Sequence, residues 1–174
     1  MMSMPTTTQP LSHAPTLPRL LTAPLGLVPP RLNSGMLARI LNRVLKPELA
    51  DGELDFLDGR VMLIRVDDAR LSFRLTLRQG RIDAAKASAS DDLSIEGSTY
   101  EFLLLATRRE DPDTLFFNRR LRLGGNTELG LYVKNLLDSL ELEDRLGPLL
   151  TVMNRAADLM ARFAGKQFRP PALP

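Results

Sequence analysis

The sequence contains no cysteine and a single histidine, His13, and these two scarcities narrow the chemistry that the chain can carry. Without cysteine there is no disulfide framework, no thiol nucleophile and no cysteine-bound metal, which fits a reducing cytoplasm. Because the one imidazole lies in a proline-rich segment, a nucleophilic triad is excluded, and a general base would have to be an unusual carboxylate or lysine. We therefore expect no catalytic residues, no metal site and no cofactor.

Long hydrophobic runs are also missing. The longest apolar stretches fall short of the roughly 20 residues that a membrane-spanning helix needs, and the N-terminal segment lacks the features of a secretory signal. A chain of 174 residues with 44% hydrophobic residues is typical of one globular domain with an extension. We expect a cytoplasmic protein that does not cross a membrane.

The beginning of the chain is basic and rich in proline. Residues 1–30 contain seven prolines, which exclude a long regular helix and indicate a flexible arm. In residues 31–47 the apolar positions follow helical spacing, and Pro47 ends or kinks the helix. Up to that proline the chain has no carboxylate, and its basic residues are Arg19, Arg31, Arg39, Arg43 and Lys46. The pattern predicts a basic amphipathic helix.

Alternating side chains predict a sheet in the middle of the chain. The clearest strand is 71–78, where Leu71, Phe73, Leu75 and Leu77 alternate with polar residues. With segments 60–66 and 81–87 it predicts an antiparallel meander, and Leu93 and Ile95 indicate a fourth strand. We expect one apolar and one hydrated face.

Helices and one more strand follow. Ser98 and Glu101 form a capping-box pattern before a helix to about residue 106, while residues 111–117 are interpreted as a turn and an irregular stretch. Residues 119–123 are a predicted strand with Arg120 and Arg122 outward. Asn126 is the predicted cap of a helix with an apolar stripe, and a last helix covers 149–165. This order predicts an α+β fold with helices packed on one face of a mixed sheet.

Three kinds of motif resemble functional sites without fitting them. The acidic pairs 67–68, 91–92 and 111–113 lie among turn-forming residues and lack calcium-loop spacing. The Gly124-Gly125-Asn126 sequence has no lysine at P-loop spacing. Arginines 119, 120 and 122 beside two phenylalanines leave nucleic-acid binding as a weak alternative to a hydrated strand face.

Two segments carry a resemblance to a known family. DPDTLFFNRRLRLGGNTELGLYVKN at 111–135 and DGELDFLDGR at 51–60 resemble bacterial members of the sterol carrier protein type two superfamily, specifically those of oxygen-independent ubiquinone biosynthesis. The resemblance covers roughly residues 32–143. It implies a mainly antiparallel five-stranded sheet with helices on one face around a hydrophobic lipid-binding tunnel. The corresponding units are an arm at 1–30, the basic helix at 31–47, the lipid-binding domain at 48–144 and a C-terminal helix and tail at 145–174.

The resemblance also implies a function, namely that the chain holds polyprenylated quinone precursors or phospholipid for iron–sulfur hydroxylase partners of the UbiU and UbiV type. Large apolar residues on the faces that must meet are the predicted lipid-binding residues. They are Phe73, Leu75, Leu104, Phe116, Phe117, Tyr132, Val133, Leu136 and Leu137. Arg39, Arg43 and Lys46 are the predicted contacts with an anionic surface of the inner membrane. A helix packed on the core is the alternative.

Two other functions stay open from the residues alone. The apolar helices could dock on a protein partner without enclosing a cavity, which would make the chain an interaction module. An enzyme that acts on a quinol precursor is a more distant alternative. Binding of a fluorescent fatty probe would separate the first alternative from a carrier, and turnover by the purified protein alone would indicate the second.

Overall fold

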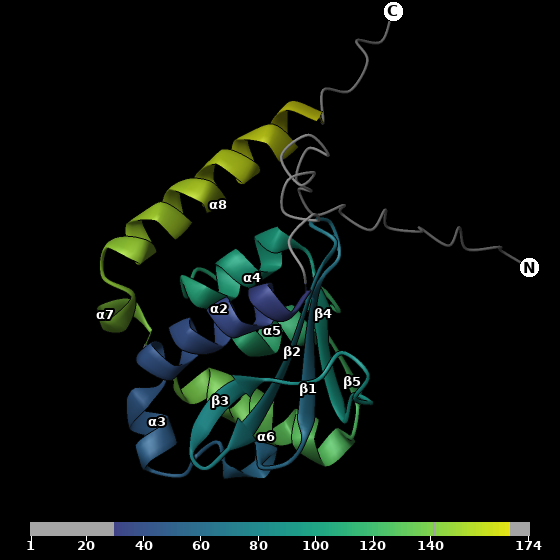
Figure 1. Ribbon diagram of the computed structural model, residues 1–174. Helices are drawn as coiled ribbons and strands as arrows, with labels where there is room; N and C mark the ends of the chain where they lie inside the picture. The colour runs from purple at the N-terminus through teal and green to yellow at the C-terminus, as the bar shows by residue number, and fades with distance from the viewer. Residues whose placement is uncertain (1–29, 141, 168–174) are drawn as a thin grey trace, which may run out of the picture.

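The computed structural model describes residues 30–140 and 142–167 and contains one five-stranded sheet in the order β3-β2-β1-β4-β5 (Figure 1). The strands are β1 (Val61–Val66), β2 (Leu71–Arg78), β3 (Arg81–Ala84), β4 (Leu93–Gly97) and β5 (Arg122–Gly125). Neighbouring strands are antiparallel except β1 and β4, which are parallel. The predicted α+β class and the mainly antiparallel five-stranded sheet are confirmed.

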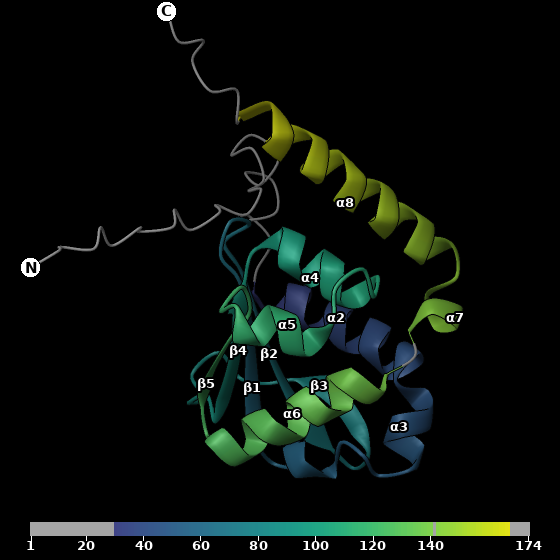
Figure 2. The ribbon, with the colours of Figure 1, turned by 180° about the vertical axis from the view of Figure 1, so that it is seen from behind.

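Helices cover one face of the sheet, as Figure 2 shows from behind. They are α2 (Pro30–Val44), α3 (Lys46–Ala50), α4 (Thr99–Ala106), α5 (Pro112–Phe117), α6 (Thr127–Ser139), α7 (Glu143–Leu146) and α8 (Pro148–Gln167), with a 3-10 helix η2 at Asp55–Leu57. His13, the other residues of the predicted arm up to residue 29, and the tail after residue 167 lie outside the described residues, whereas Pro30, the last residue of the predicted arm, begins α2. No helix among the described residues is both long and apolar enough to span a bilayer.

The register of β1 and β2 explains why the helix-covered face is apolar. Met62 lies opposite Leu75, and Ile64 lies opposite Phe73. Because directly opposed residues point to the same side of a sheet, these four side chains share one face. Leu77 continues this face two residues after Leu75, and its side chain is fully buried.

The opposite face of the sheet carries ion pairs between neighbouring strands. The Arg65 guanidinium lies 2.5 Å from a Glu96 carboxylate oxygen, and Arg122 donates to Asp67 at 2.7 Å. A loop between β3 and β4 crosses this face, and its Asp91 accepts two hydrogen bonds from Arg74 (Figure 1). The outward position of Arg122 is therefore confirmed, whereas the predicted hydrated face is only partly hydrated, because Leu63 and Thr76 are buried on it.

The segment after α4 differs from the sequence interpretation. Residues 112–117 form α5 instead of an irregular stretch, because Asp111 caps the helix by accepting from the Thr114 amide at 2.9 Å and Pro112 occupies its first turn. The strand begins at Arg122 instead of residue 119, since Arg119 has a φ of 56° that breaks an extended chain. Arg120 does not point outward from a strand but contacts Glu110 at 2.7 Å.

Of the two predicted helix caps, one is formed and the other is not formed in full. Asn126 caps α6 as predicted, because its side-chain oxygen accepts from the amides of Glu128 and Leu129. At α4, in contrast, the Ser98 hydroxyl bonds the Glu101 carboxylate and caps no backbone amide, so the predicted capping box is not formed in full.

The last helix, α8, packs over α4 at the edge of the helical layer (Figure 2). Ala157 and Met160 are buried in this contact. Arg109, just beyond α4, donates to the Asn154 side chain at 2.7 Å and to Asp158 at 2.6 Å. The hydrogen bonds of Arg109 and the apolar contact of Ala157 and Met160 therefore hold α8 against the rest of the domain.

Candidate functional site

Two apolar clusters fill the space between the sheet and the helices. The first joins α2, α3 and η2 to β2 and β3, and its buried members are Ala38, Val44, Leu45, Leu54, Leu57, Leu75, Leu77, Ile82 and Leu140. The second joins β4 to α6 through Leu93, Ile95, Leu129 and Val133. Phe56, Met62 and Leu137 pack against both. We call these two connected clusters the interior cluster.

A third group, the α4–α5 cluster, consists of Leu104, Leu115 and Leu121. Its members are almost inaccessible to solvent, with Leu115 at 0% and Leu121 at 1% exposure. Phe102 and Phe116 pack against both this cluster and the interior cluster. The apolar interior is therefore continuous from α2 to α5.

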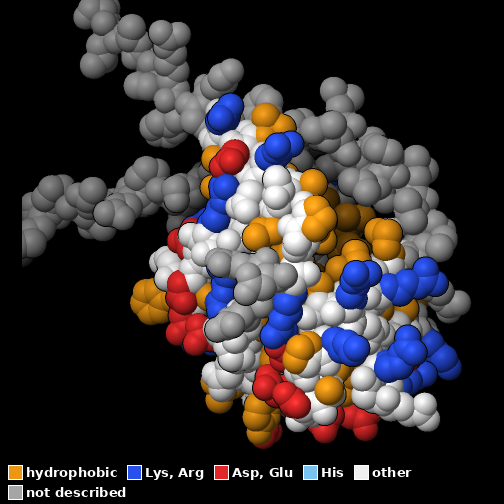
Figure 3. All heavy atoms as spheres, turned by 90° about the vertical axis from the view of Figure 1, so that its left-hand side faces the viewer, with side chains coloured by type: hydrophobic (Ala, Val, Ile, Leu, Met, Phe, Trp, Pro, Cys, Tyr) orange, Lys and Arg blue, Asp and Glu red, His pale blue; other side chains and the backbone are white. Residues whose placement is uncertain are grey.

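The interior cluster is incompletely covered on the side of α2. Leu37 and Leu41 of this helix, and Ile64 of β1, pack against the cluster while remaining only half-buried. The space-filling view of the side where α7 and the start of α8 lie shows hydrophobic side chains gathered around a hollow (Figure 3). Because a closed core excludes solvent from such side chains, this side is the candidate entrance to the interior.

The structure brings most of the predicted lipid-binding residues together. Leu75, Leu104 and Val133 are buried, whereas Phe116, Leu136 and Leu137 are half-buried against the clusters. Phe73 is half-buried on the same sheet face as Leu75. Tyr132 is 47% exposed and stacks on Phe56, with ring centroids 5.5 Å apart.

Phe117 differs from the expectation for this set. Its side chain is 88% exposed and belongs to none of the three clusters. The reason is the helix α5, in which consecutive residues point about 100° apart, so Phe116 faces the interior and Phe117 faces solvent. Phe117 does not line the interior, and the expectation for this residue is wrong.

Several residues of the interior are not among the predicted lipid-binding residues. Phe56, Met62 and Leu129 belong to the interior cluster or pack against it, together with Leu93 and Ile95. The alternation of Leu93 and Ile95 was visible in the sequence, but only the pairing of β4 with β1 places it beside Met62. Phe56 lies in the DGELDFLDGR segment, where no periodic pattern indicates which way it points.

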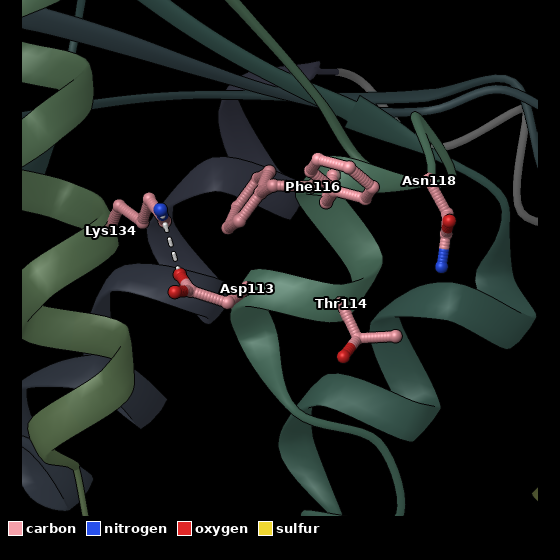
Figure 4. Close-up of a pocket in the computed structure, with 6 residues that line it drawn as sticks. Asp113, Thr114, Phe116, Asn118 and Lys134 are labelled. Atoms are coloured by element: carbon pink, nitrogen blue, oxygen red, sulfur yellow. Dashed lines mark ion pairs between the residues drawn. The ribbon is translucent and has the colours of Figure 1, made fainter.

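A separate surface pocket of about 510 Å³ lies between α5 and α6 (Figure 4). It is lined by Asp113, Thr114, Phe116, Phe117, Asn118 and Lys134. The Lys134 ammonium lies 2.8 Å from an Asp113 carboxylate oxygen, so the charge of this pair is internally balanced. The Thr114 hydroxyl donates to the Asp111 carboxylate at 3.3 Å, and the same carboxylate oxygen accepts from the Thr114 amide, so this bond belongs to the cap of α5.

One carboxylate is buried in the helical layer. Glu101 of α4 is 2% exposed, and burial raises its pKa, while the Arg120 guanidinium at 3.5 Å opposes that change. Arg120 also binds Glu110, which places one cation between two acids and explains the position of this arginine inside the layer. Within residues 30–140 and 142–167 there is no group of three or more potential metal ligands.

The predicted membrane-contact residues lie on the outside of the domain. Arg39 and Arg43 are exposed on α2, and Lys46 is exposed at the start of α3. They share this part of the chain with the apolar side chains Met36 and Ile40, which are 60% and 39% exposed. A basic helix forms as predicted but ends at Val44, because Pro47 lies in the first turn of α3 instead of ending α2, and its contact with a membrane stays a prediction.

Most of the chain is similar in sequence to known proteins. The model of the SCP-2 sterol transfer family matches residues 37–138. The chain is 40% identical over 143 residues to the ubiquinone biosynthesis accessory factor UbiT of Escherichia coli K12, covering 82% of each chain, and equally similar to UbiT of Escherichia coli O157:H7.

Solved structures of similar proteins include a ubiquinone synthesis protein titled UbiJ-SCP2, with a TM-score of 0.49 and 18% identity, covering 62% of this chain and 89% of that one. Another is sterol carrier protein 2 from Yarrowia lipolytica in its apo form, with a TM-score of 0.41 and 15% identity, covering 64% and 94% of the two chains. The family match extends over more than half of the sequence, and the UbiT relatives match over four fifths of it. The chain therefore belongs to the SCP-2 sterol transfer family.

Proposed function

We propose that this protein is a non-enzymatic carrier that encloses the apolar tail of a lipid in its interior. The observation that carries the proposal is the interior cluster, which is continuous beneath the sheet and only half covered at α2. A polyprenyl or acyl chain is nearly insoluble, because each CH₂ group removed from water contributes about 0.8 kcal/mol. Soluble enzymes therefore gain access to such a substrate when another protein shields it.

The ligand that we propose is a polyprenylated ubiquinone intermediate or a phospholipid. Support comes from the UbiT relatives, whose name assigns them to ubiquinone biosynthesis. The carrier would present the head group to hydroxylating partners of the UbiU and UbiV type in the oxygen-independent route, as the sequence resemblance implied. Its action would be cytoplasmic with contact at the inner membrane through Arg39, Arg43 and Lys46.

The proposed lining consists of the predicted residues that the structure brings together. These are Phe73, Leu75, Phe116, Tyr132, Val133, Leu136 and Leu137, whereas Leu104 is left out of the lining because it belongs to the closed α4–α5 cluster. Leu137 is the most informative of them, because it packs against both parts of the interior cluster without being fully buried. A charge at this position would face hydrocarbon, which is strongly unfavourable unless the ligand leaves.

The test compares two substitutions on the same helix. Leu137→Asp is expected to reduce lipid bound to the purified protein at least tenfold, measured by native mass spectrometry, whereas Leu131→Asp, at a position 57% exposed, should leave it unchanged. Circular dichroism establishes that both variants are folded, and Leu137→Asn replaces Leu137→Asp if the latter unfolds. Equal lipid content in the folded variants would refute the assignment.

A second candidate function is a protein-interaction module without a lipid cavity. The observation in its favour is the pair of apolar side chains exposed near the α5–α6 pocket, Phe117 at 88% and Leu131 at 57%. Such residues are typical of contact surfaces between proteins. A delipidated sample that binds no fluorescent fatty probe would favour this function over the carrier.

A further inference from the structure

Helix α8 has an apolar ridge that is not used in its packing. The helix buries Ala157 and Met160, yet Val152 and Leu159 remain 62% and 54% exposed. These two residues are seven positions apart, so they lie almost in line on one side of the helix. Exposure of large aliphatic side chains in such a row is unfavourable in water and indicates a surface that contacts something else.

Basic residues flank the same ridge. Arg155 and Arg162 follow Val152 and Leu159 by three residues each, and both are exposed. The sequence of α8 contains one carboxylate, Asp158, and that group is bound by Arg109. The outer side of α8 is therefore apolar and cationic at once, with its single acid already neutralised.

Helix α2 presents the same combination. Met36 and Ile40 are exposed one turn apart, and Arg39 and Arg43 stand beside them. Figure 3 views the side on which α8 and the end of α2 are seen, where Lys and Arg side chains gather next to the hydrophobic hollow. Helix α8 lies beyond residues 37–138, which the family model matches.

From these observations we propose that the ridge of α8 and the exposed side of α2 together form a docking surface for an anionic phospholipid bilayer, with the hollow facing the lipid. Aliphatic side chains insert at the boundary between head groups and acyl chains, and Lys and Arg attract the anionic head groups. The charge pattern matches such a surface, since both helices are cationic in a chain whose net charge is only +2.

This inference rests on the proposed carrier function and adds the direction from which lipid enters. With the hollow against the bilayer, a hydrocarbon tail moves from the membrane into the interior cluster without passing through water. In this arrangement the apolar and cationic sides of α8 and α2 contact the same membrane. The inference therefore assigns a role in membrane docking to α8, which lies outside the residues that the family model matches.

Site-specific labelling tests the geometry with the full chain. Because the sequence has no cysteine, a single cysteine introduced at Val152, Leu159 or Met36 can carry an environment-sensitive NBD label at a unique position. The vesicles contain phosphatidylcholine with about 30% phosphatidylglycerol, which makes their surface anionic. They should raise NBD emission at least about twofold at each of these sites. A label at Leu131, exposed on α6, serves as the matched control and should not respond.

Charge reversal tests the contribution of α8. Arg155→Glu with Arg162→Glu is expected to lower partitioning onto the anionic vesicles at least about 25-fold, since each basic residue near the surface strengthens binding about fivefold. The control, Arg78→Glu with Arg81→Glu at the exposed β2–β3 turn, should change it less than about twofold, because charges beyond a Debye length are screened.

Three outcomes overturn the inference. They are equal vesicle binding of the α8 variant and the wild type, equal NBD responses at Leu131 and Val152, and binding of an acidic protein in place of vesicles. Lipid loading from cyclodextrin, without vesicles, separates this inference from the carrier function. Normal loading of the α8 variant together with lost vesicle binding supports docking. No loading of the wild type together with intact vesicle binding supports docking and overturns the carrier proposal.

Discussion

The α4–α5 cluster and the α2 side of the interior cluster are built from the same kinds of residue and are covered differently. Leu115 and Leu121 are excluded from solvent, whereas Leu37 and Leu41 contact their cluster and remain half-buried. Hydrophobic composition therefore does not distinguish a structural core from a candidate lipid site in this protein. The completeness of burial does, and it gives the two regions different expected responses to the same substitutions.

Removing a side chain should show the largest difference. Leu115→Ala is expected to lower the free energy of unfolding by about 2–5 kcal/mol, because it leaves a cavity in a closed cluster. Leu41→Ala should lower it by about 1 kcal/mol or less, since water or ligand already reaches that side chain. Urea denaturation of delipidated protein measures both values, and equal losses would remove the distinction between the regions.

Adding volume sharpens the same comparison. Leu115→Phe should cost about 1–3 kcal/mol through overpacking, while Leu41→Phe should cost less than about 1 kcal/mol and lower lipid occupancy by adding volume beside the half-covered part of the interior cluster. Thermal unfolding and native mass spectrometry report the two effects separately. If Leu41→Phe destabilised the protein as strongly as Leu115→Phe, the α2 side would be an ordinary packed core.

Glu101 provides a smaller effect that depends on pH. Because burial raises its pKa in the folded state, the folded protein holds this proton more tightly than the unfolded chain, and stability falls as pH rises above 4.5 toward the raised pKa. Glu101→Gln should reduce this fall, which can be measured as the free energy of unfolding between pH 4 and 7. An unchanged pH dependence would show that Arg120 fully compensates the burial.

The sequence predicted those parts of the fold in which local pattern and tertiary role agree. The alternation around Leu75 and the Asn126 cap both appear as expected, since each depends on neighbouring residues. The parallel pairing of β1 with β4 joins Met62 to Leu93, thirty-one residues away, and no local pattern reports such a contact.

Prediction of the candidate site was wrong on α5, where the position of a residue in a short helix determines whether its side chain faces the interior or the solvent. The Asp111-Pro112 pair is compatible with a turn and with a helix start, and the helix that it begins places Phe117 in solvent and Phe116 in the interior. The predicted lining was therefore closest to the structure on β2 and α6, where periodicity is strong. It was weakest on the short helix, whose orientation depends on its packing against α6.

Extraction of the purified full-length protein with organic solvent, followed by mass spectrometry of the extract, tests the central claim most directly. We expect a polyprenylated quinone precursor or phospholipid at close to one molecule per chain, and its loss from the folded Leu137→Asp variant. An extract without lipid, from a protein that also binds no fatty probe after delipidation, would show that the interior cluster is closed and would contradict the carrier function.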